Sequence, residues 1–425
     1  MKFPPCRRLA ALFLLTASLL AAKAPGDFPR LFGMNIGRKI YDDPGYRASL
    51  AKLDVVILGF YPGWNPHNEP DPIGAVLHDL RRLNPALKIG QYTSLNESYG
   101  DPAMVGAADL VAALDRHHWW ARNAAGDKVQ WTPRYHTWET NNTAWAPPDA
   151  AGRRYPQWLA ARNDRLLFKP HPEFDIWYVD NVMWRPRETA DWDRDGKDDD
   201  RDDPRIQAAY RAGMASYWTA IRRLEPSLTI MGNTDSDLSA PEFRRQLDAA
   251  FLEGWMGARY SIERRKGWAA AMELYRTTLG NLPPGAMLAV NIHAPSDDFR
   301  FFRYAFASCL LDDGYFSFSD SKELYSSVVW FDEFDIPLGR ARSAPPAAAW
   351  QEGVWRRDFD GGIALVNPTE ATVTVQVGSG LHRLAGKQDP RTNDGRPASA
   401  VTLASKDGII LVRDRASPPD ISHPE

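Results

Sequence analysis

The stretch "FDIWYVDNVMWRP", residues 174–186, combines a buried strand with a polar ending. Its apolar run from Ile176 to Val179 has no polar face, which is typical of a strand covered on both sides in a parallel sheet. Asp180 and Asn181 follow at once, with no turn residue before them. The stretch therefore predicts a strand of a covered parallel sheet that ends in groups suited to chemistry.

Apolar runs of the same kind recur along the chain. They occupy residues 31–37, 54–64, 87–94, 228–235, 249–255, 287–293 and 314–320. Helical patterns separate several of them, such as 73–85 and 204–226. Eight strands alternating with helices predict an α/β fold, a (β/α)8 TIM barrel. The alternative is a doubly wound open sheet, but the Gly-rich phosphate turn typical of its first strand is missing.

The sequence patterns at the two ends of the chain predict a signal peptide and a C-terminal domain. Residues 1–24 have the pattern of a secretory signal peptide: three basic residues, an apolar run from Leu9 to Leu20 that is too short to span a membrane, and small residues after it. From Trp350 the pattern becomes alternating and turn-rich, which predicts a small antiparallel β-sandwich. The expected organisation is a signal peptide (1–24), a barrel (28–340), a C-terminal β-sandwich (350–414) and a disordered tail (415–425).

The composition narrows the choice of partners. The 51 Lys and Arg residues nearly balance 54 Asp and Glu, which argues against nucleic acid or an anionic membrane as the main partner. The 16 Trp residues are consistent with sugar stacking and also with a large core. After cleavage of the signal peptide we expect a secreted or periplasmic protein that has no membrane association and binds a carbohydrate.

Asp180 and Glu253 are the expected catalytic residues, because they end the fourth and the sixth predicted strands. Reactive groups of a (β/α)8 barrel lie at the carboxyl ends of its strands. Glycosidic cleavage needs two facing carboxyl groups, one to protonate the leaving oxygen and one to stabilise or capture the oxocarbenium-like centre. The alternative is structural: a strand-end acid often caps a helix or pairs with an arginine such as Arg259.

Other polar and aromatic residues near the strand ends are suited to sugar recognition. The expected substrate-binding residues are Trp64, Tyr92, Asn96, Glu97, Asn181, Trp184, Asn233, Asp235, Trp255, Asn291, His293 and Asp320. Each alone is as readily explained as a loop-stabilising residue, and Glu97 is the main rival of Glu253 as second carboxylate. The aromatic segment 116–145 is expected to fold over the barrel mouth, with Trp119 and Trp138 contacting substrate.

Four motifs, "WYVDN", "FLEGW", "WFDEFDIPLG" and "GGIALVNPT", resemble those of hypothetical glycoside hydrolases grouped as glycosyl-hydrolase-like family 15. That group lies within the α-galactosidase-like set of TIM-barrel glycosidases. The resemblance implies retaining hydrolysis of O-glycosidic bonds, with Asp180 as the nucleophile and Glu253 as the acid/base. Many members of the wider set place Asp on the sixth strand, so Glu253 departs from that pattern.

The acidic run "DWDRDGKDDDRDD", residues 191–203, has the spacing of a calcium-binding loop. The expected ligands are Asp191, Asp193, Asp195, Lys197, Asp199 and Asp202. The twelfth place holds Asp rather than Glu, and Asp198 replaces the usual hydrophobe. We expect a structural calcium ion that orders the loop after Asp180; the alternative is a solvated acidic loop.

Two functional hypotheses follow from these patterns. The first is a secreted glycoside hydrolase that uses Asp180 and Glu253. The second is a non-catalytic carbohydrate-binding protein on a degenerate barrel. The first requires both carboxylates to converge at one cleft.

Overall fold

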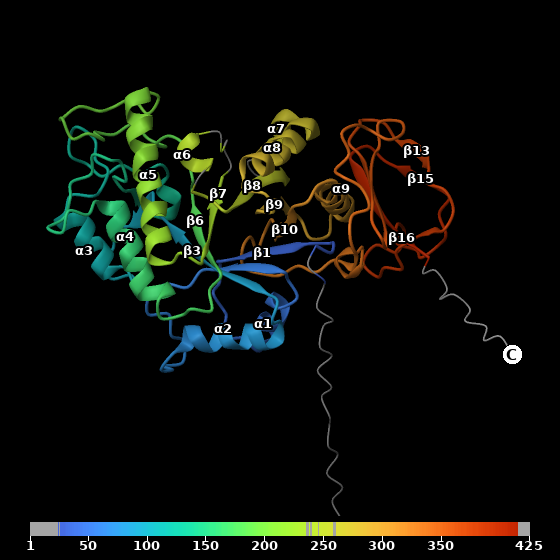
Figure 1. The fold of residues 1–425 in the computed structure, drawn as a ribbon, viewed down its shortest axis with the longest axis horizontal. Helices are drawn as coiled ribbons and strands as arrows, with labels where there is room; N and C mark the ends of the chain where they lie inside the picture. Colours follow the sequence, from blue (N-terminus) through green and yellow to red (C-terminus); the bar gives the residue numbers. More distant parts are fainter. Residues whose placement is uncertain are drawn as a thin grey trace, which may run out of the picture.

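The computed structural model describes residues 24, 26–234, 238, 240–244, 246–257 and 261–414. The expected tail, Asp235, Arg259 and the expected signal peptide up to residue 23 lie outside these residues. Within them, eight parallel strands close into a barrel (Figure 1). In chain order the strands are β1 (Leu31–Asn35), β2 (Val55–Leu58), β3 (Lys88–Ser94), β6 (Ile176–Asp180), β7 (Thr229–Asn233), β8 (Ala249–Gly257), β9 (Met287–Ala294) and β10 (Tyr315–Asp320). Each apolar run of the sequence forms one of them, so the predicted barrel is confirmed.

Helices between the strands cover the outside of the barrel (Figure 1). They are α1 (Pro44–Leu50), α2 (Pro72–Leu83), α3 (Ala108–Arg116), α4 (Tyr155–Asn163), α5 (Pro204–Leu224), α6 (Pro241–Arg244), α7 (Ile262–Lys266), α8 (Trp268–Asn281) and α9 (Phe299–Leu310). Three of them begin at an Asp-Pro pair, in which the side chain of Asp43, Asp71 or Asp203 accepts a backbone N–H of the first turn. Proline suits the first helical position because its missing N–H would have no partner there. No helix among the described residues has the length and apolar character needed to cross a membrane.

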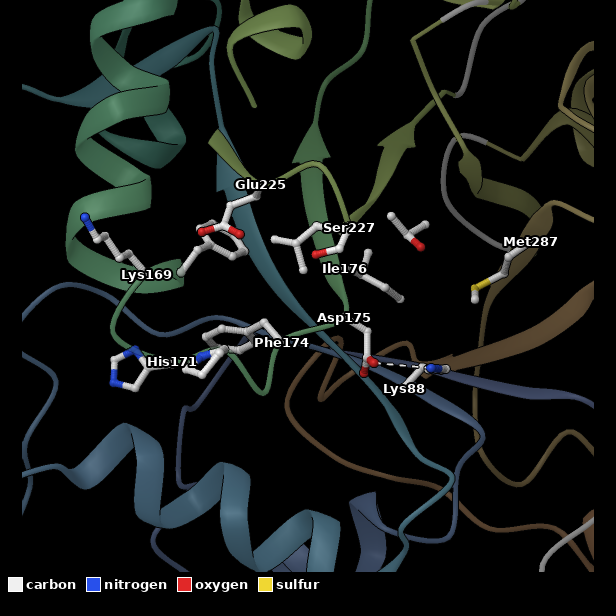
Figure 2. A pocket seen from close by; sticks show the side chains of 13 residues that line it. Lys88, Lys169, His171, Phe174, Asp175, Ile176, Glu225, Ser227 and Met287 are labelled. Carbon is white, nitrogen blue, oxygen red and sulfur yellow. Dashed lines mark hydrogen bonds and ion pairs between the residues drawn. The ribbon is translucent and has the colours of Figure 1, made fainter. Parts of the chain in front are cut away.

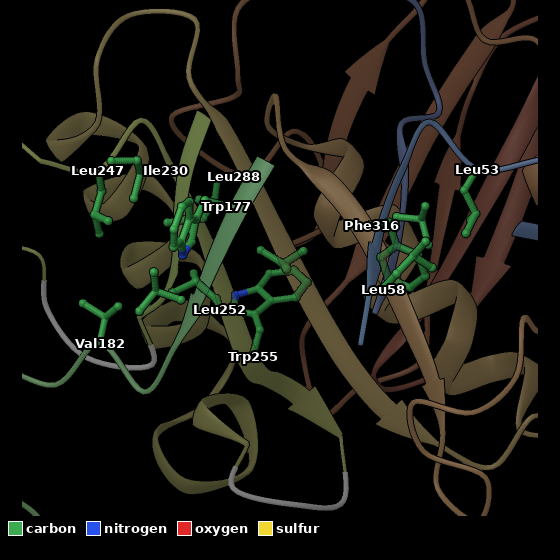
Figure 3. Close-up of a cluster of buried hydrophobic side chains, with 14 of the residues drawn as sticks. Leu53, Leu58, Trp177, Val182, Ile230, Leu247, Leu252, Trp255, Leu288 and Phe316 are labelled. Carbon is green, nitrogen blue, oxygen red and sulfur yellow. The ribbon is translucent and has the colours of Figure 1, made fainter. Parts of the chain in front are cut away.

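The surroundings of β6 explain why this strand is apolar on both faces. Ile176 and Tyr178 point into the barrel and belong to the cluster that fills its interior. Trp177 and Val179 point outward into the larger cluster between strands and helices, and Figure 3 shows Trp177 among other side chains of this outer layer. Because side chains alternate along a strand, Asp180 follows Ile176 and Tyr178 on the inner face, at the barrel mouth.

After the barrel, the chain forms two antiparallel sheets. One has the strand order β11 (Trp355–Asp358), β12 (Gly362–Asn367), β16 (Asp407–Arg413) and β14 (Leu381–Arg383), and the other pairs β13 (Val373–Gln376) with β15 (Ala400–Leu403). The two sheets bury a common apolar cluster that includes Ile363, Val375, Val401 and Leu411. The sequence "DFDGG" spans the turn between β11 and β12, as a hairpin signal should.

Helix α9 joins the barrel to these sheets and lies between them in Figure 1. Phe302 and Phe306 pack on Phe316 of β10. On the other side, Arg303 forms an ion pair of 2.6 Å with Asp389, which lies between β14 and β15. Gly408 of β16 lies so close to α9 that an added Cβ would be 2.6 Å from the Arg303 carbonyl oxygen.

Candidate active site

Asp180 and Glu253 both lie at the carboxyl end of the barrel, on β6 and β8. Each is followed by a residue in the left-handed region, Asn181 with φ 54° and Gly254 with φ 62°. Asn and Gly adopt this conformation at little cost. In β8 the pairing with β9 shifts between Leu252 and Met256. This bulge contains Glu253, and bulges near active sites commonly re-aim a side chain.

The amide of Asn233 connects the two carboxylates. Its Nδ2 donates to Asp180 Oδ1 at 2.9 Å and to Glu253 Oε2 at 2.9 Å. Asn233 ends β7, the strand between β6 and β8 in the barrel. The two acceptor oxygens are therefore no farther apart than twice 2.9 Å. One side chain thus holds two carboxyl groups at a fixed short separation.

Two tyrosines complete the hydrogen bonding of the pair. Tyr92 of β3 donates its hydroxyl proton to Asp180 Oδ2 at 2.6 Å. Burial and the negative charges around it raise the pKa of Tyr92 well above its usual value, so it stays a donor. Tyr325 donates to Glu253 Oε1 and contacts His293 Nε2 at 3.2 Å.

The electrostatic setting of Asp180 is unusual for an aspartate. Burial raises the pKa of its carboxyl to about 6, with the negative charge of Glu253 as the second cause. Hydrogen bonds from Tyr92 and Asn233 lower this pKa, because they stabilise the ionised form. The negative charge of Glu253 so close to Asp180 makes it unfavourable for both carboxyl groups to be ionised together.

Comparison with known families identifies the family of the chain. The sequence model of one family, described as hypothetical glycosyl hydrolase family 15, matches residues 81–363, more than half of the chain. The chain belongs to that family. It is therefore a glycoside hydrolase, as the sequence predicted, and its substrate is a carbohydrate. No curated protein matches the hydrolase significantly.

Solved structures similar to this hydrolase are distant. The glycoside hydrolase domain of PelA from Pseudomonas aeruginosa is 16% identical, with a TM-score of 0.41, over 69% of this chain and 95% of that one. The debranching enzyme of Nostoc punctiforme is 12% identical, with a TM-score of 0.49, over 88% of each chain. An Anoxybacillus alpha-amylase is 9% identical, with a TM-score of 0.47, over 89% of this chain and 90% of that one.

Four of the expected substrate-binding residues gather around the carboxylate pair of this hydrolase. Tyr92 and Asn233 bind the carboxylates directly, and Asn181 Nδ2 lies 3.3 Å from Asp180 Oδ2. His293 reaches the pair through Tyr325. Tyr92 therefore acts through its hydroxyl group, rather than as the apolar wall that the sequence suggested.

Several expected sugar-stacking rings lie in the core instead. Trp64 is 5% exposed and packs on Phe60, with ring centroids 5.0 Å apart. Trp255 is fully buried and donates to the Ala271 carbonyl at 2.7 Å. Their assignment to substrate binding is wrong, because both rings are buried in the apolar core. Trp184 is 37% exposed, and the Arg185 guanidinium lies 5.4 Å from the centroid of its ring.

The aromatic segment contributes Trp119 to the apolar core and not to the surface. Trp119 is fully buried, and its Nε1 donates to the Pro147 carbonyl at 2.7 Å. Its ring packs against Tyr155 and Trp158. The expected contact of Trp119 with substrate is therefore wrong. Trp138 on β5 (Thr137–Glu139) is partly exposed.

Glu97, the rival second carboxylate, is tied to other groups. Its Oε2 accepts from Arg187 at 2.9 Å, from Thr137 at 3.0 Å and from Trp131 at 3.1 Å. Arg187 also forms an ion pair with the buried Glu139 at 2.7 Å, and burial raises the pKa of Glu139 to about 7. Glu97 thus anchors β4 (Glu97–Tyr99) to the loop after β6, and Glu253 is the carboxylate that shares a donor with Asp180.

Three more expected substrate-binding residues have structural partners. Asn96 is buried and donates to the hydroxyl of Tyr210, so its placement at the mouth is wrong. Asn291 lies inside the barrel and donates to Ser317 and Ser319, both at 3.1 Å. Asp320 accepts backbone N–H groups of the loop that follows β10, which lower its pKa. The structural alternative describes these three better.

Sequence reasoning missed Tyr325. It lies in the loop after β10, five residues beyond Asp320, and donates to Glu253. The signal was present, because loops after barrel strands form the cleft and "SKELYSS" is such a loop. A tyrosine there is far in sequence from Glu253, however, and no spacing rule connects them.

A separate cavity of about 440 Å³ lies at the other end of the barrel (Figure 2). Lys88, Ile176 and Met287, the first residues of β3, β6 and β9, line it. Lys88 forms an ion pair with Asp175 there at 3.2 Å. Because the catalytic groups of this fold lie at the carboxyl ends of the strands, this cavity is not the catalytic site.

The acidic loop gathers half of the expected calcium ligands. Carboxylate oxygens of Asp191, Asp193 and Asp195 all lie within 4.8 Å of one another. Gly196, with φ 87°, permits the turn that brings them together. Three convergent carboxylates suit a hard divalent cation.

The remaining expected ligands have other partners. Asp199 accepts the Trp192 N–H at 2.9 Å and pairs with Arg205 at 3.1 Å. Asp202 pairs with Arg185, and Lys197 Nζ lies 4.0 Å from Asp195. Arg205 also pairs with Asp193 of the cluster, at 2.6 Å. Arginines therefore neutralise Asp199, Asp202 and one of the three clustered carboxylates, and Asp191 and Asp195 have no arginine partner among the described residues.

Proposed function

We propose that the chain is a secreted, retaining glycoside hydrolase that cleaves O-glycosidic bonds of an oligo- or polysaccharide. Asp180 is the nucleophile and Glu253 the acid/base. The observation that carries this proposal is the amide of Asn233, which donates 2.9 Å hydrogen bonds to both carboxylates. A non-catalytic binding protein has no need of two carboxyl groups held together in this way.

The short separation supports retention. Carboxyl groups of retaining enzymes lie about 5–5.5 Å apart, whereas inverting enzymes need roughly 6.5–9.5 Å to admit a water molecule. Oxygens that share one amide nitrogen at 2.9 Å fall short of the inverting range. Analysis of the first-formed product anomer by NMR tests this: retention of the anomeric configuration is expected, and inversion contradicts the proposal.

The donors around Asp180 support its role as the nucleophile. Asp180 accepts hydrogen bonds from Tyr92, Asn233 and Asn181, which stabilise the negative charge of a nucleophile. Glu253 carries the proton that the leaving oxygen takes. Once it has given up this proton, it serves as the base that activates water to hydrolyse the glycosyl-enzyme intermediate.

Export is part of the proposal. The basic residues, the short apolar run and the small residues at the start of the sequence support cleavage near Ala22. N-terminal sequencing of the protein recovered from outside the cytoplasm tests it.

We expect kcat/KM to fall as the pH drops below about 6. The pKa of Asp180 is raised to about 6, and the protonated carboxyl group is no nucleophile. The charge of Glu253 is one cause of that raised pKa, so Glu253→Gln should move this acid limb to lower pH. The measurement is the pH profile of kcat/KM for both proteins on an aryl glycoside with a good leaving group. An acid limb that is unchanged in the variant would argue against the coupling of the pair.

We also propose that calcium binds at Asp191, Asp193 and Asp195 and stabilises the loop after β6. Added calcium should raise the melting temperature, because a ligand at 100 times its Kd adds about 2.7 kcal/mol to native stability. Asp191→Asn should abolish this response, while the control Asp43→Asn, at the start of α1, should keep it. Identical melting curves in calcium and in chelator would rule the site out.

A further inference from the structure

A groove of about 820 Å³ lies between the loop after β6 and the helices α7 and α8. Trp184, Arg185 and Arg201 line it from the loop, and Arg265, Lys266 and Glu273 line it from the helices. Four of these six residues are cationic and one is anionic. The chain as a whole carries a formal charge of −3, whereas the charged residues that line this groove are mostly positive.

The groove is lined by segments that neighbour the two catalytic strands in sequence or in space. Trp184 follows Asp180 by four residues, so it lies within about 14 Å of it even in a fully extended chain. Helix α7 packs against β8, the strand that carries Glu253, and Figure 1 shows α7 and α8 beside the end of β8. The groove therefore lies near enough to the carboxylate pair for a long sugar polymer to reach both.

The cationic side chains are positioned in different ways. Arg185 pairs with Asp202, and Arg201 donates to the carbonyl of Arg187, so both guanidinium groups are fixed by the loop. Lys266 is exposed and forms no ion pair with any described carboxylate. Its charge is available for a ligand.

Trp184 adds the contact that a sugar ring requires. It is 37% exposed, and the Arg185 guanidinium lies 5.4 Å from the centroid of its ring. An indole face packs on the apolar face of a sugar, while arginine donates to a carboxylate or sulfate group. In this groove the stacking face of Trp184 and the charged group of Arg185 are adjacent.

We propose that this groove binds negatively charged sugar units, so that the substrate of the hydrolase is an anionic polysaccharide. The inference rests on the proposed function, because it assigns the groove to the substrate of that reaction. The groups recognised are carboxylate or sulfate, which share their affinity for arginine and lysine. A neutral glucan can accept hydrogen bonds from these side chains, but it brings no negative charge to pair with their positive charges.

Affinity electrophoresis tests the proposal with three polymers: polygalacturonate (carboxylate), dextran sulfate (sulfate) and dextran (neutral). The protein used carries Glu253→Gln, so that no polymer is consumed. We expect retardation by polygalacturonate, dextran sulfate or both, and none by dextran. Adding Arg265→Gln and Lys266→Gln should weaken the binding about tenfold, and salt should weaken it further.

The matched control carries Arg223→Gln and Arg391→Gln, an equal charge change at two exposed arginines elsewhere. It should bind as before. Lys266→Glu alone serves as a second variant if loss of Arg265 disturbs α7. Equal binding to dextran, or equal losses in the groove and control variants, would overturn the proposal. Binding does not depend on turnover, so anionic binding without hydrolysis contradicts only the proposed function, and hydrolysis of neutral polymers alone contradicts only this inference.

Discussion

Glu253→Gln is expected to lower kcat by about 10²–10⁴-fold, the range that general acid–base catalysis contributes. Glutamine keeps the size of the side chain but has no acidic proton to give to the leaving oxygen. The loss should shrink on an aryl glycoside whose leaving group needs no protonation. Steady-state kinetics on both kinds of substrate measure the difference.

Asp180→Ala should cost at least as much, because it removes the nucleophile itself. Added azide should restore turnover by attacking from the vacated side, and the product should then have the inverted configuration. Glu97→Gln is the informative comparison, since Glu97 is the rival carboxylate. If Glu97→Gln abolishes turnover while Glu253→Gln keeps near-normal rates, our assignment is wrong.

Neither catalytic change should unfold the protein. A carboxyl group whose pKa is raised to about 6 by burial is unfavourable to ionise in the folded state. Its contribution to stability is therefore full below the unfolded pKa and is lost as the pH rises through about 6. A neutral residue in place of Asp180 avoids that cost at pH 7, so activity and stability should separate cleanly.

Trp119→Ala should lower the free energy of unfolding by about 3–5 kcal/mol, as expected for a large buried aromatic residue. Trp119 is fully buried, and the substitution leaves a cavity beside Tyr155 and Trp158. Denaturant unfolding measures the loss. Substrate affinity of the protein that remains folded should change little, because the ring does not reach the mouth.

Trp184→Ala provides the matched control. This ring is 37% exposed, so its removal should change stability by less than about 0.5 kcal/mol. Its effect should appear in KM instead, because Trp184 lines the groove beside the catalytic mouth. A large stability loss in Trp184→Ala, or a negligible one in Trp119→Ala, would contradict the burial that separates the two.

The barrel was readable from the sequence because its signal is local. A run such as Ile176–Val179 is apolar on both faces only if both faces are covered, and eight such runs alternate with helices. Asp180 was readable for the same reason, since alternation along β6 places it on the inner face.

The rest of the site depends on contacts between residues that no periodic sequence pattern relates. The only sign in the sequence of the β8 bulge that holds Glu253 is Gly254, which follows it. Tyr325 contacts Glu253 from a loop 72 residues further along the chain. Trp119 and Trp64 lie in or next to irregular segments, where no periodicity distinguishes a buried ring from an exposed one. The high number of tryptophans reflects, for Trp64 and Trp119, a large apolar core and not sugar binding.

The position of α9 makes the barrel dependent on the sheets that follow it. Phe302 and Phe306 serve the barrel, while Arg303 and the backbone beside it are covered by the chain around Asp389 and Gly408. In a protein that ends at residue 340, the side of α9 that faces the sheets would be exposed to solvent. Arg303 would also lose its ion pair with Asp389. The C-terminal sheets thus cover the outer side of a barrel helix, and we expect a protein that ends at residue 340 to be less soluble than the full chain.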